Sequence, residues 1–213
     1  MSAPKKETPE SPVLAIGQPY GGGFFSGITQ ENGKRYINIT AGATHELVGP
    51  WGKYGEKIEG ADSFTDSLAN TKAMAAAGSD LAAKVLALTI GGFTDWAIPA
   101  RDVQELQYRH FKPTTEENCA NSRNGDNPHS EPVGLLYSEE DPLQTVHEAF
   151  QEGGPEAFRD TWYWSSSQRS ANYAFDQFFD DGDQLNNDKY YELRVRPRPT
   201  CSYRFRVSEE GAR

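Results

Sequence analysis

The segment from Asn172 to Tyr191 carries the side chains of this sequence that are best suited to bind a ligand. It reads NYAFDQFFDDGDQLNNDKYY, so aromatic rings are interleaved with carboxylates and amides. Aromatic rings supply rigid contact area at a low entropic cost, and Asn and Asp side chains adapt their hydrogen bonds to a partner. This composition is typical of a surface that binds a glycan or a protein. The alternative interpretation is an ordinary hairpin with a solvated, aspartate-rich turn.

The same segment contains carboxylates that could hold Ca²⁺, which prefers hard oxygen ligands. Four aspartates lie close together in the sequence: Asp180, Asp181, Asp183 and Asp188. Their spacing does not match the D-x-[DN]-x-[DN]-G calcium loop, and a turn alone explains an Asp-Gly pair. We therefore predict no metal and no cofactor, and keep calcium as the alternative.

Side chains in the spacings of common catalytic sites do not occur. The four histidines lack H-x-H and H-E-x-x-H patterns, and Ser165 to Ser167 lack the G-x-S-x-G of a nucleophile elbow. We expect these serine hydroxyls to bond to the backbone of a turn. Paired acids can hydrolyse glycosides, but Glu116-Glu117 and Glu139-Glu140 are adjacent on loops and indicate solvated charge. We predict that the protein is not an enzyme.

Strands must position the Asn172–Tyr191 segment. Residues 162–164 lead in as a strand, Asp181-Gly182 predicts a hairpin turn, and residues 189–196 alternate as a further strand. Alternation along a strand would place Ala174, Asp176 and Phe178 on one side. Tyr173, Phe175, Gln177 and Phe179 would lie on the other.

Upstream elements are predicted from turn residues and apolar periodicity. Asn32-Gly33 predicts a hairpin before the strand of residues 36–39. Residues 63–88 predict two helices, the first ending at Gly78 and the second capped by Ser79. Residues 100–111 predict an amphipathic helix that includes His110. We expect a polar surface loop over residues 113–132. A last helix should start at Asp141-Pro142 and carry these residues: Leu143, Val146, His147 and Phe150.

Composition bounds the size and the partners of the protein. The 213 residues are 36% hydrophobic and 12% aromatic, so aromatic side chains should fill much of one core. We predict a flexible tail over residues 1–12, one domain over 13–198 and a tail over 199–213, in which residues 202–207 are either an edge strand or tail. A net charge of −10 disfavours nucleic-acid binding, and the absence of a long apolar run disfavours membrane insertion. Cys119 and Cys201 do not form a disulfide framework, and whether they pair stays open.

Two ordered blocks of residues carry a family resemblance. Residues 92–99 read GFTDWAIP and are followed by Asp102, Glu105 and Leu106. Residues 163–167 read YWSSS, with further matched residues downstream: Ala174, Phe179, Gly182, Lys189, Val195, Arg196 and Pro197. Weaker matches lie at Trp51-Gly52, Gly60-Ala61 and Asn70-Thr71. Over about residues 18–198, this pattern resembles the collagen-like adhesin C-terminal domain family (the Lcl C-terminal domain).

The resemblance implies an α+β, C-type-lectin-like fold with short antiparallel strands, a few helices and long loops, often assembled as a trimer. Such domains occur in bacterial surface adhesins, in phage tail-tip and fibre proteins, and in the variable proteins of diversity-generating retroelements. They bind ligands rather than transform them. The chain has no collagen-like stalk and no secretory signal, which favours a virion protein released by lysis.

The resemblance also divides the last third of the chain, from Trp162 to Arg198, into two roles. It places Ala174 and Phe179 inward, which requires a bulge or register change between them. The expected scaffold residues are Trp164, Ala174, Phe179, Gly182 and Val195, with Trp96 as a further core anchor. The expected ligand-binding residues lie between them: Tyr173, Asp176, Phe178, Asp183, Asn186, Asn187, Asp188 and Tyr190.

The leading hypothesis is a homotrimeric phage tail protein that is assembled in the host cytoplasm and binds a host surface glycan or protein. The alternative locations are the bacterial cytoplasm and the cell surface. A second hypothesis is a structural virion component that binds a neighbouring tail, baseplate or capsid subunit.

The sequence leaves two further hypotheses. A retroelement variable protein would diversify adenine-rich Asn codons, and the ligand-binding residues above, with Tyr191, all belong to the set reachable that way. Formylglycine-generating enzymes have a related fold and use two cysteines, but Cys119 and Cys201 are far apart in sequence, which disfavours this enzymatic alternative.

Overall fold

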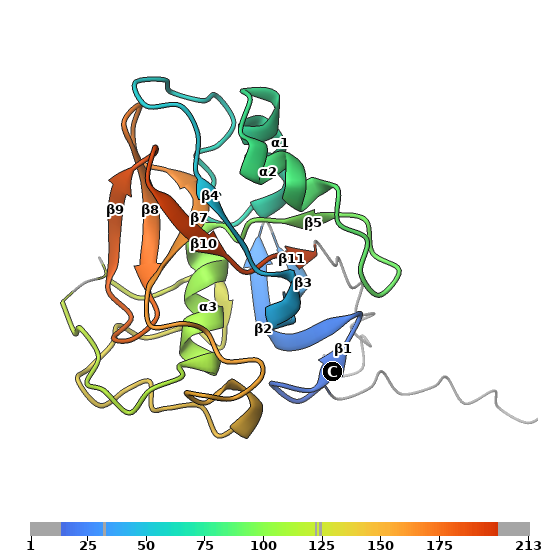
Figure 1. Cartoon of the computed structure of the whole chain (residues 1–213). Coiled ribbons are helices and arrows are strands. Elements are labelled where there is room, and N and C mark those ends of the chain that lie inside the picture. The colour runs from blue at the N-terminus through green and yellow to red at the C-terminus, as the bar shows by residue number, and fades with distance from the viewer. Residues whose placement is uncertain (1–13, 32, 122, 124, 200–213) are drawn as a thin grey trace, which may run out of the picture.

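The structure is a computed structural model that describes residues 14–31, 33–121, 123 and 125–199 (Figure 1). About 30% of the chain is strand and 19% is helix, so the predicted α+β class is confirmed. The predicted tail of residues 1–12, the predicted strand or tail of residues 202–207, and Cys201 lie outside the described residues. Pro199, which the sequence assigns to the C-terminal tail, instead pairs with Trp96 in a two-stranded sheet.

The first sheet is built around a long hairpin. β2 pairs with β3 through Glu31 and Lys34, with Gly33 at φ 71° in the connection, as the Asn-Gly pair predicts. A short strand from the loop of residues 113–132 pairs with the other edge of β2. The strands of this sheet are β1 (Pro19–Tyr20), β2 (Gly23–Glu31), β3 (Lys34–Ala41) and β6 (Ser130–Glu131).

The second sheet has five strands in the order β4-β10-β7-β8-β9. They are β4 (Leu47–Pro50), β7 (Trp162–Gln168), β8 (Tyr173–Phe178), β9 (Gln184–Asp188) and β10 (Glu192–Val195). All neighbours are antiparallel except β10 and β7. The strand predicted over residues 189–196 corresponds to β10, which is shorter than predicted because residues 189–191 form a turn. The two-stranded sheet pairs β5 (Trp96–Ala97) with β11 (Arg198–Pro199).

The register change expected between Ala174 and Phe179 lies on the neighbouring strand. Trp164 pairs with Asp176 but Gln168 pairs with Ala174, so β7 carries the irregularity while β8 stays in regular register with β9. Phe179 follows the end of β8, where the chain has left the strand and turns inward. This is how Ala174 and Phe179 are both buried.

Three α-helices lie among the described residues: α1 (Ser67–Ala76), α2 (Asp80–Leu86) and α3 (Arg101–Phe111). The predicted cap is confirmed, because the Ser79 hydroxyl accepts from the Ala82 amide at 3.4 Å. The first helix ends before Gly78, whose φ is 92°. Figure 1 shows α1 and α2 on one side of the five-stranded sheet and α3 beneath it. None of the described helices is long and apolar enough to cross a membrane.

The buried side chains form two clusters, and aromatic residues are prominent in both. Trp51, Trp96 and Trp164 are fully buried in the larger cluster, beside the helices α1 and α2. The smaller cluster is almost wholly aromatic, and Phe158 stacks on Phe179 with ring centres 4.1 Å apart. The predicted role of tryptophans as core anchors and the predicted aromatic core are confirmed.

The helix predicted from Asp141-Pro142 is wrong. Leu143 and Val146 are 74% and 84% exposed, and only a single 3-10 turn, η2 (Glu148–Phe150), forms. His147 therefore precedes this turn rather than lying in a helix. Phe150 alone of the predicted stripe is buried, stacked at 4.0 Å on Phe111. A short helix needs a buried apolar face, and this segment has none.

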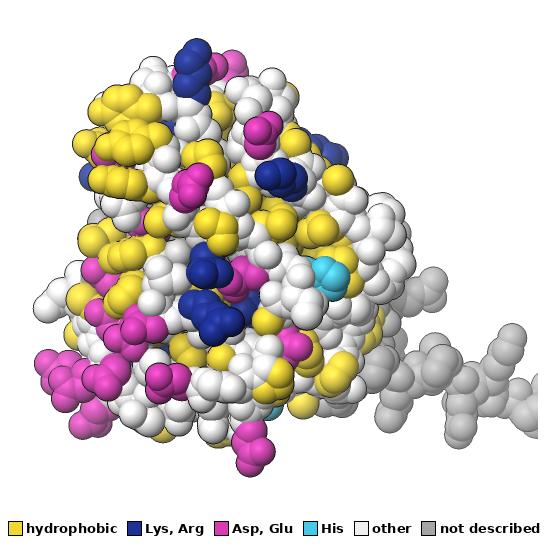
Figure 2. Space-filling model, viewed as in Figure 1, with side chains coloured by type: hydrophobic (Ala, Val, Ile, Leu, Met, Phe, Trp, Pro, Cys, Tyr) yellow, Lys and Arg dark blue, Asp and Glu magenta, His cyan; other side chains and the backbone are white. Residues whose placement is uncertain are grey.

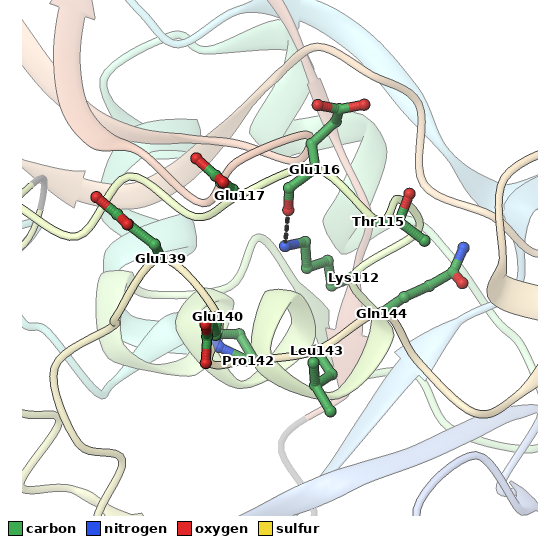
Figure 3. Close-up of a pocket in the computed structure, with 9 residues that line it drawn as sticks. All are labelled: Lys112, Thr115, Glu116, Glu117, Glu139, Glu140, Pro142, Leu143 and Gln144. Atoms are coloured by element: carbon green, nitrogen blue, oxygen red, sulfur yellow. Dashed lines mark hydrogen bonds between the residues drawn. The ribbon is translucent and has the colours of Figure 1, made fainter.

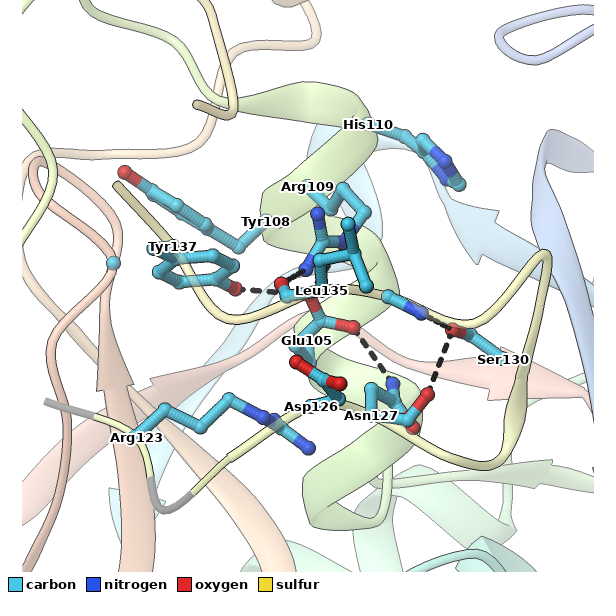
Figure 4. Close-up of polar contacts among 12 residues, drawn as sticks. Glu105, Tyr108, Arg109, His110, Arg123, Asp126, Asn127, Ser130, Leu135 and Tyr137 are labelled. Atoms are coloured by element: carbon cyan, nitrogen blue, oxygen red, sulfur yellow. Dashed lines mark hydrogen bonds and ion pairs between the residues drawn. The ribbon is translucent and has the colours of Figure 1, made fainter. Parts of the chain in front are cut away.

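The loop over residues 113–132 is polar, as predicted, but it is not only a surface loop. Arg123 forms a buried ion pair with Asp102 at 3.0 Å, and Asn127 donates to Glu105 at 2.6 Å. Figure 4 shows Glu105 bonded to Asn127, and Arg109 and Tyr137 also donate to Glu105. Buried carboxylates on α3 require donors, so part of the loop folds back to supply them.

Candidate ligand-binding surface

The predicted ligand-binding residues lie on one hairpin but face two directions. Cross-strand neighbours in an antiparallel pair share a face. Tyr173 pairs with Asp188, and Ala174 pairs with Asn187 one position further on, so Asp188 and Asn187 point to opposite sides. Asn187 contacts Asp176, because these two residues lie on the same side of the hairpin. The eight residues therefore do not make a single surface.

Asp176 is not displayed, contrary to the prediction. The residue is only 1% exposed. Its Oδ2 accepts from the side-chain amide of Asn187 at 2.5 Å. Asp176 pairs with Trp164 of β7 and lies on the same side of β8 as Ala174, and both of these residues belong to the larger buried cluster. Alternation from the buried Ala174 therefore places Asp176 inward rather than on display.

The other predicted residues reach solvent to different degrees. Tyr173 and Tyr190 are 40% and 53% exposed. Phe178 packs at 5.1 Å against Trp162, which half-buries it. The remaining residues are half-buried: Asp183, Asn186, Asn187 and Asp188. The exposed residues of this set are therefore Tyr173 and Tyr190, which lie at the end of the hairpin where β8 starts and β9 ends.

A cluster of tyrosines lies at that end. Tyr190 stands 5.5 Å from Tyr54 and 4.8 Å from Tyr191, measured between ring centres. The three rings are each about half exposed. We call Tyr54, Tyr190 and Tyr191 the tyrosine patch. Figure 2 shows hydrophobic side chains gathered at the upper left, over the end of the sheet where the β9–β10 turn meets the loop after β4.

Tyr54 is the member of this patch that sequence reasoning missed. It lies between Lys53 and Gly55 in a polar loop, far from Tyr190 in the sequence. An aromatic residue in a glycine-containing, polar loop is a weak indication of a displayed side chain. Only the fold brings the two loops together.

A buried lysine holds the two loops in contact. Lys189 is fully buried, and its ammonium group donates to the Glu56 carbonyl at 2.8 Å and to Gln168 at 3.0 Å. It also lies 4.5 Å from the ring centre of Trp51. Burial lowers the pKa of Lys189 to about 8. Lys189 thus anchors the turn that displays Tyr190.

Polar groups border the tyrosine patch. The Tyr190 hydroxyl donates to Asp188 at 2.9 Å, and this hydrogen bond raises the pKa of Tyr190. Asn186 and the exposed Glu192 lie nearby in the chain. The arrangement combines ring faces with hydrogen-bonding groups, which can receive a ligand that has both apolar and hydroxyl or amide groups.

A second aromatic group lies on the α3 side of the hairpin. The Arg101 guanidinium group is 4.7 Å from the ring centre of Phe64 and 5.2 Å from that of Phe175. Phe64 and Phe175 meet edge to face at 5.6 Å. This stack fixes β8 on the start of α3, so we assign it to the support of the hairpin.

The aspartates considered as calcium ligands occupy turn positions. Asp181 accepts from the Asp183 amide at 2.9 Å, which closes the turn that contains Gly182. Asp188 accepts from Tyr190, as described above. Among the described residues no three His, Cys, Asp or Glu side chains are grouped to hold a metal ion.

The serines bond mainly to backbone, as predicted, but they lie within the strand β7 rather than in the expected turn. The Ser167 hydroxyl accepts from the Arg101 amide at 3.0 Å and donates to the Ser63 carbonyl at 2.6 Å. The Ser165 hydroxyl accepts from the Ser167 amide at 3.2 Å. These contacts join β7 to the start of α3 and to the loop before α1.

The adjacent acids come together around a pocket of about 290 Å³ (Figure 3). Lys112 lies beneath it, and its ammonium group donates to the Glu116 carbonyl and to Asn118. Burial lowers the pKa of this lysine. The four glutamates of the pocket are exposed: Glu116, Glu117, Glu139 and Glu140. Their exposure agrees with the interpretation as solvated charge.

Comparison of the chain with protein-family models, with curated proteins and with solved structures gave no match.

Proposed function

We propose that this chain is a non-enzymatic binding module that presents the tyrosine patch to a ligand. The observation that carries the proposal is the mutual packing of three half-exposed rings from two separate loops. Single exposed apolar residues are normal on a protein surface, whereas a contiguous group bordered by polar side chains is typical of an interaction site.

The surroundings of the patch favour a glycan or a protein as its ligand. Tyrosine rings offer flat apolar area that packs on the C–H faces of sugars or on side chains. Asp188 and Asn186 can bond to hydroxyl or amide groups at the edge. The net charge of −10 disfavours nucleic acid, because phosphates would be repelled.

We further propose a C-type-lectin-like module of a phage tail that binds the host surface as a trimer. Supporting this, the residues expected as scaffold occupy buried positions, and aromatic, carboxylate and amide side chains lie between them in the sequence. Trp164, Ala174, Phe179, Gly182 and Val195 are all buried. Three copies of a weak site would give avidity without a larger surface on each copy.

The test is binding to a glycan array of bacterial surface polysaccharides and to bacterial envelope fractions. Wild-type protein is compared with a triple variant, Tyr54→Ala, Tyr190→Ala and Tyr191→Ala. We expect the triple variant to lose at least tenfold in affinity, since aromatic anchors dominate such interfaces. The matched control is Leu143→Ala with Val146→Ala, which removes exposed apolar side chains elsewhere and should bind as wild type.

The proposal fails if wild-type protein binds none of these probes, or if the triple variant binds as tightly as wild type while both remain folded. An electron cryo-microscopy map with the tyrosine patch against another virion subunit would instead identify a structural component of the particle. Sedimentation of the purified chain tests the trimer separately.

A further inference from the structure

Asp176 is a buried carboxyl group with one oxygen that lacks a hydrogen bond. Oδ2 accepts from Asn187, but Oδ1 has no hydrogen-bond partner in the part of the chain that the structure describes. Buried polar groups almost always have a partner. Asp176 Oδ1 is an exception, and it lies in β8, the first strand of the hairpin that leads to the tyrosine patch.

The groups that face Asp176 supply no positive charge. Its paired residues are Trp164 on β7 and Leu185 on β9, neither of which ionises. Asp183, before β9, adds a negative charge.

Two further charged groups of the hairpin region, Arg101 and Asp188, belong to its other face, and Asp183 is the one charged group of the described residues that shifts the pKa of Asp176. Arg101 of α3 stacks on Phe175, whose side chain alternates away from Asp176. Asp188 pairs with Tyr173 on that same side. An ionised Asp176 would thus be a buried anion without a cation, which is strongly disfavoured.

We propose that Asp176 acts as a proton-controlled latch of the β8–β9 hairpin. The protonated carboxyl group keeps β8 and β9 together, with Asn187 bonded across the pair. The ionised carboxylate draws water into the pair and loosens β9. This inference rests on the proposed function, because loosening β9 displaces Tyr190 and Tyr191 from Tyr54 and weakens the ligand surface.

The working range of the latch follows from its surroundings. Burial, with the Asp183 charge as a smaller contribution, raises the pKa of Asp176 to about 7, against the opposing effect of the Asn187 hydrogen bond. The hairpin is therefore closed in mildly acidic solution and looser above neutral pH. A ligand surface regulated in this range would respond to the pH of its surroundings.

The latch is tested by hydrogen exchange of the β9 amides at pH 6 and pH 8, with intrinsic exchange rates corrected for pH. Protection in the wild type should fall about tenfold between these values, as one group with a pKa near 7 dictates. In the Asp176→Asn variant the protection of the β9 amides should be the same at pH 6 and at pH 8. The control Asp80→Asn, an exposed change on α2, should behave as wild type.

A further variant guards against the case in which Asp176→Asn folds poorly. Asp183→Asn keeps Asp176 but removes the negative charge that raises its pKa, so the transition should move to lower pH. The latch is refuted if wild-type protection does not change, or if Asp176→Asn retains the tenfold change.

Exchange needs no ligand, so it separates the latch from the proposed function. Binding of wild type to a captured glycan or envelope probe should also weaken between pH 6 and pH 8, and that of Asp176→Asn should not. Equal wild-type binding at both values would show that the latch does not regulate this surface. Failure of the triple tyrosine variant to lose binding would count against the proposed function alone.

Discussion

The ammonium nitrogen of Lys189 lies 4.5 Å from the ring centre of Trp51, and neither residue reaches solvent. This contact joins the turn after β9 to the loop after β4. Trp51 in turn donates from its ring nitrogen to the Ser165 carbonyl at 2.8 Å, which ties the loop to β7. The two loops that display tyrosines are thus fixed to the centre of the sheet.

Replacing Lys189 by methionine should destabilise the protein by about 2–3 kcal/mol. The variant keeps the buried chain but leaves the Glu56 carbonyl without its donor and removes the cation from the Trp51 ring. Urea unfolding measures the change. Lys72→Met, an exposed change on α1, should stay within about 0.5 kcal/mol of wild type. Equal losses in both variants would contradict the anchoring role.

The stability of the protein should fall as pH rises from 5 to 8 through the contribution of Asp176. Its pKa is raised to about 7 in the folded state from an ordinary value of 3.8. Between pH 4 and pH 7 the Asp176 carboxyl group is protonated in the folded state and ionised in the unfolded state. Its contribution to stability is therefore fully present below about pH 4 and is lost as the pH passes 7. The expected loss from pH 5 to pH 8 is about 2–3 kcal/mol.

The comparison with Asp176→Asn isolates this contribution in urea titrations at each pH. Burial lowers the pKa of His110, so that group contributes stability that rises with pH and partly masks the effect. Subtracting the variant's profile from that of the wild type removes the contribution of His110. A difference that does not vary with pH would show that Asp176 titrates normally.

Gly182→Ala should cost more stability than a glycine substitution at an open turn. A Cβ at Gly182 would lie 2.4 Å from the Tyr108 ring, and φ there is 78°. Gly153 has a similar φ of 80° but no atom within 4 Å of its would-be Cβ. Gly153→Ala should therefore report the backbone cost alone, about 1 kcal/mol. We expect at least about 2 kcal/mol more for Gly182→Ala, measured by thermal or urea unfolding.

Arg123→Met should destabilise the protein by about 3 kcal/mol, because it removes the guanidinium group from the buried Asp102 and leaves only the partly exposed His129 ring beside it. The result distinguishes a loop that is part of the packed structure from a surface loop, for which the change would cost almost nothing. A double variant with Asp102→Asn should lose less than the sum of the single losses. Additive losses would show that the ion pair is not energetically coupled.

The sequence predicts the local features of the fold correctly where one residue type is required. Gly33 and Gly182 adopt positive φ in hairpin connections, and Ser79 caps α2. These outcomes follow from backbone sterics and short-range hydrogen bonds. The two blocks that carry the family resemblance also supply buried residues such as Trp96 and Trp164.

Features that depend on tertiary contacts are predicted poorly. Tyr54 meets Tyr190 only because Lys189 and Trp51 bring their loops together. Asp176 is buried because its side of β8, which also carries Ala174, packs with Trp164 into the larger buried cluster. The segment with Leu143 and Val146 has helical spacing, but nothing packs on it, so its apolar residues remain exposed.

The tyrosine patch is attached to the scaffold mainly through groups other than its own side chains. Lys189 accepts from the Gly52 amide at 3.2 Å, and Asp188 accepts from the Tyr191 amide at 3.0 Å, both through backbone carbonyls. Positions 54, 190 and 191 can therefore be randomised in a library while the loops keep their course. Selection from such a library could change what the module recognises without re-engineering its folding, which makes the chain a candidate scaffold for new binders.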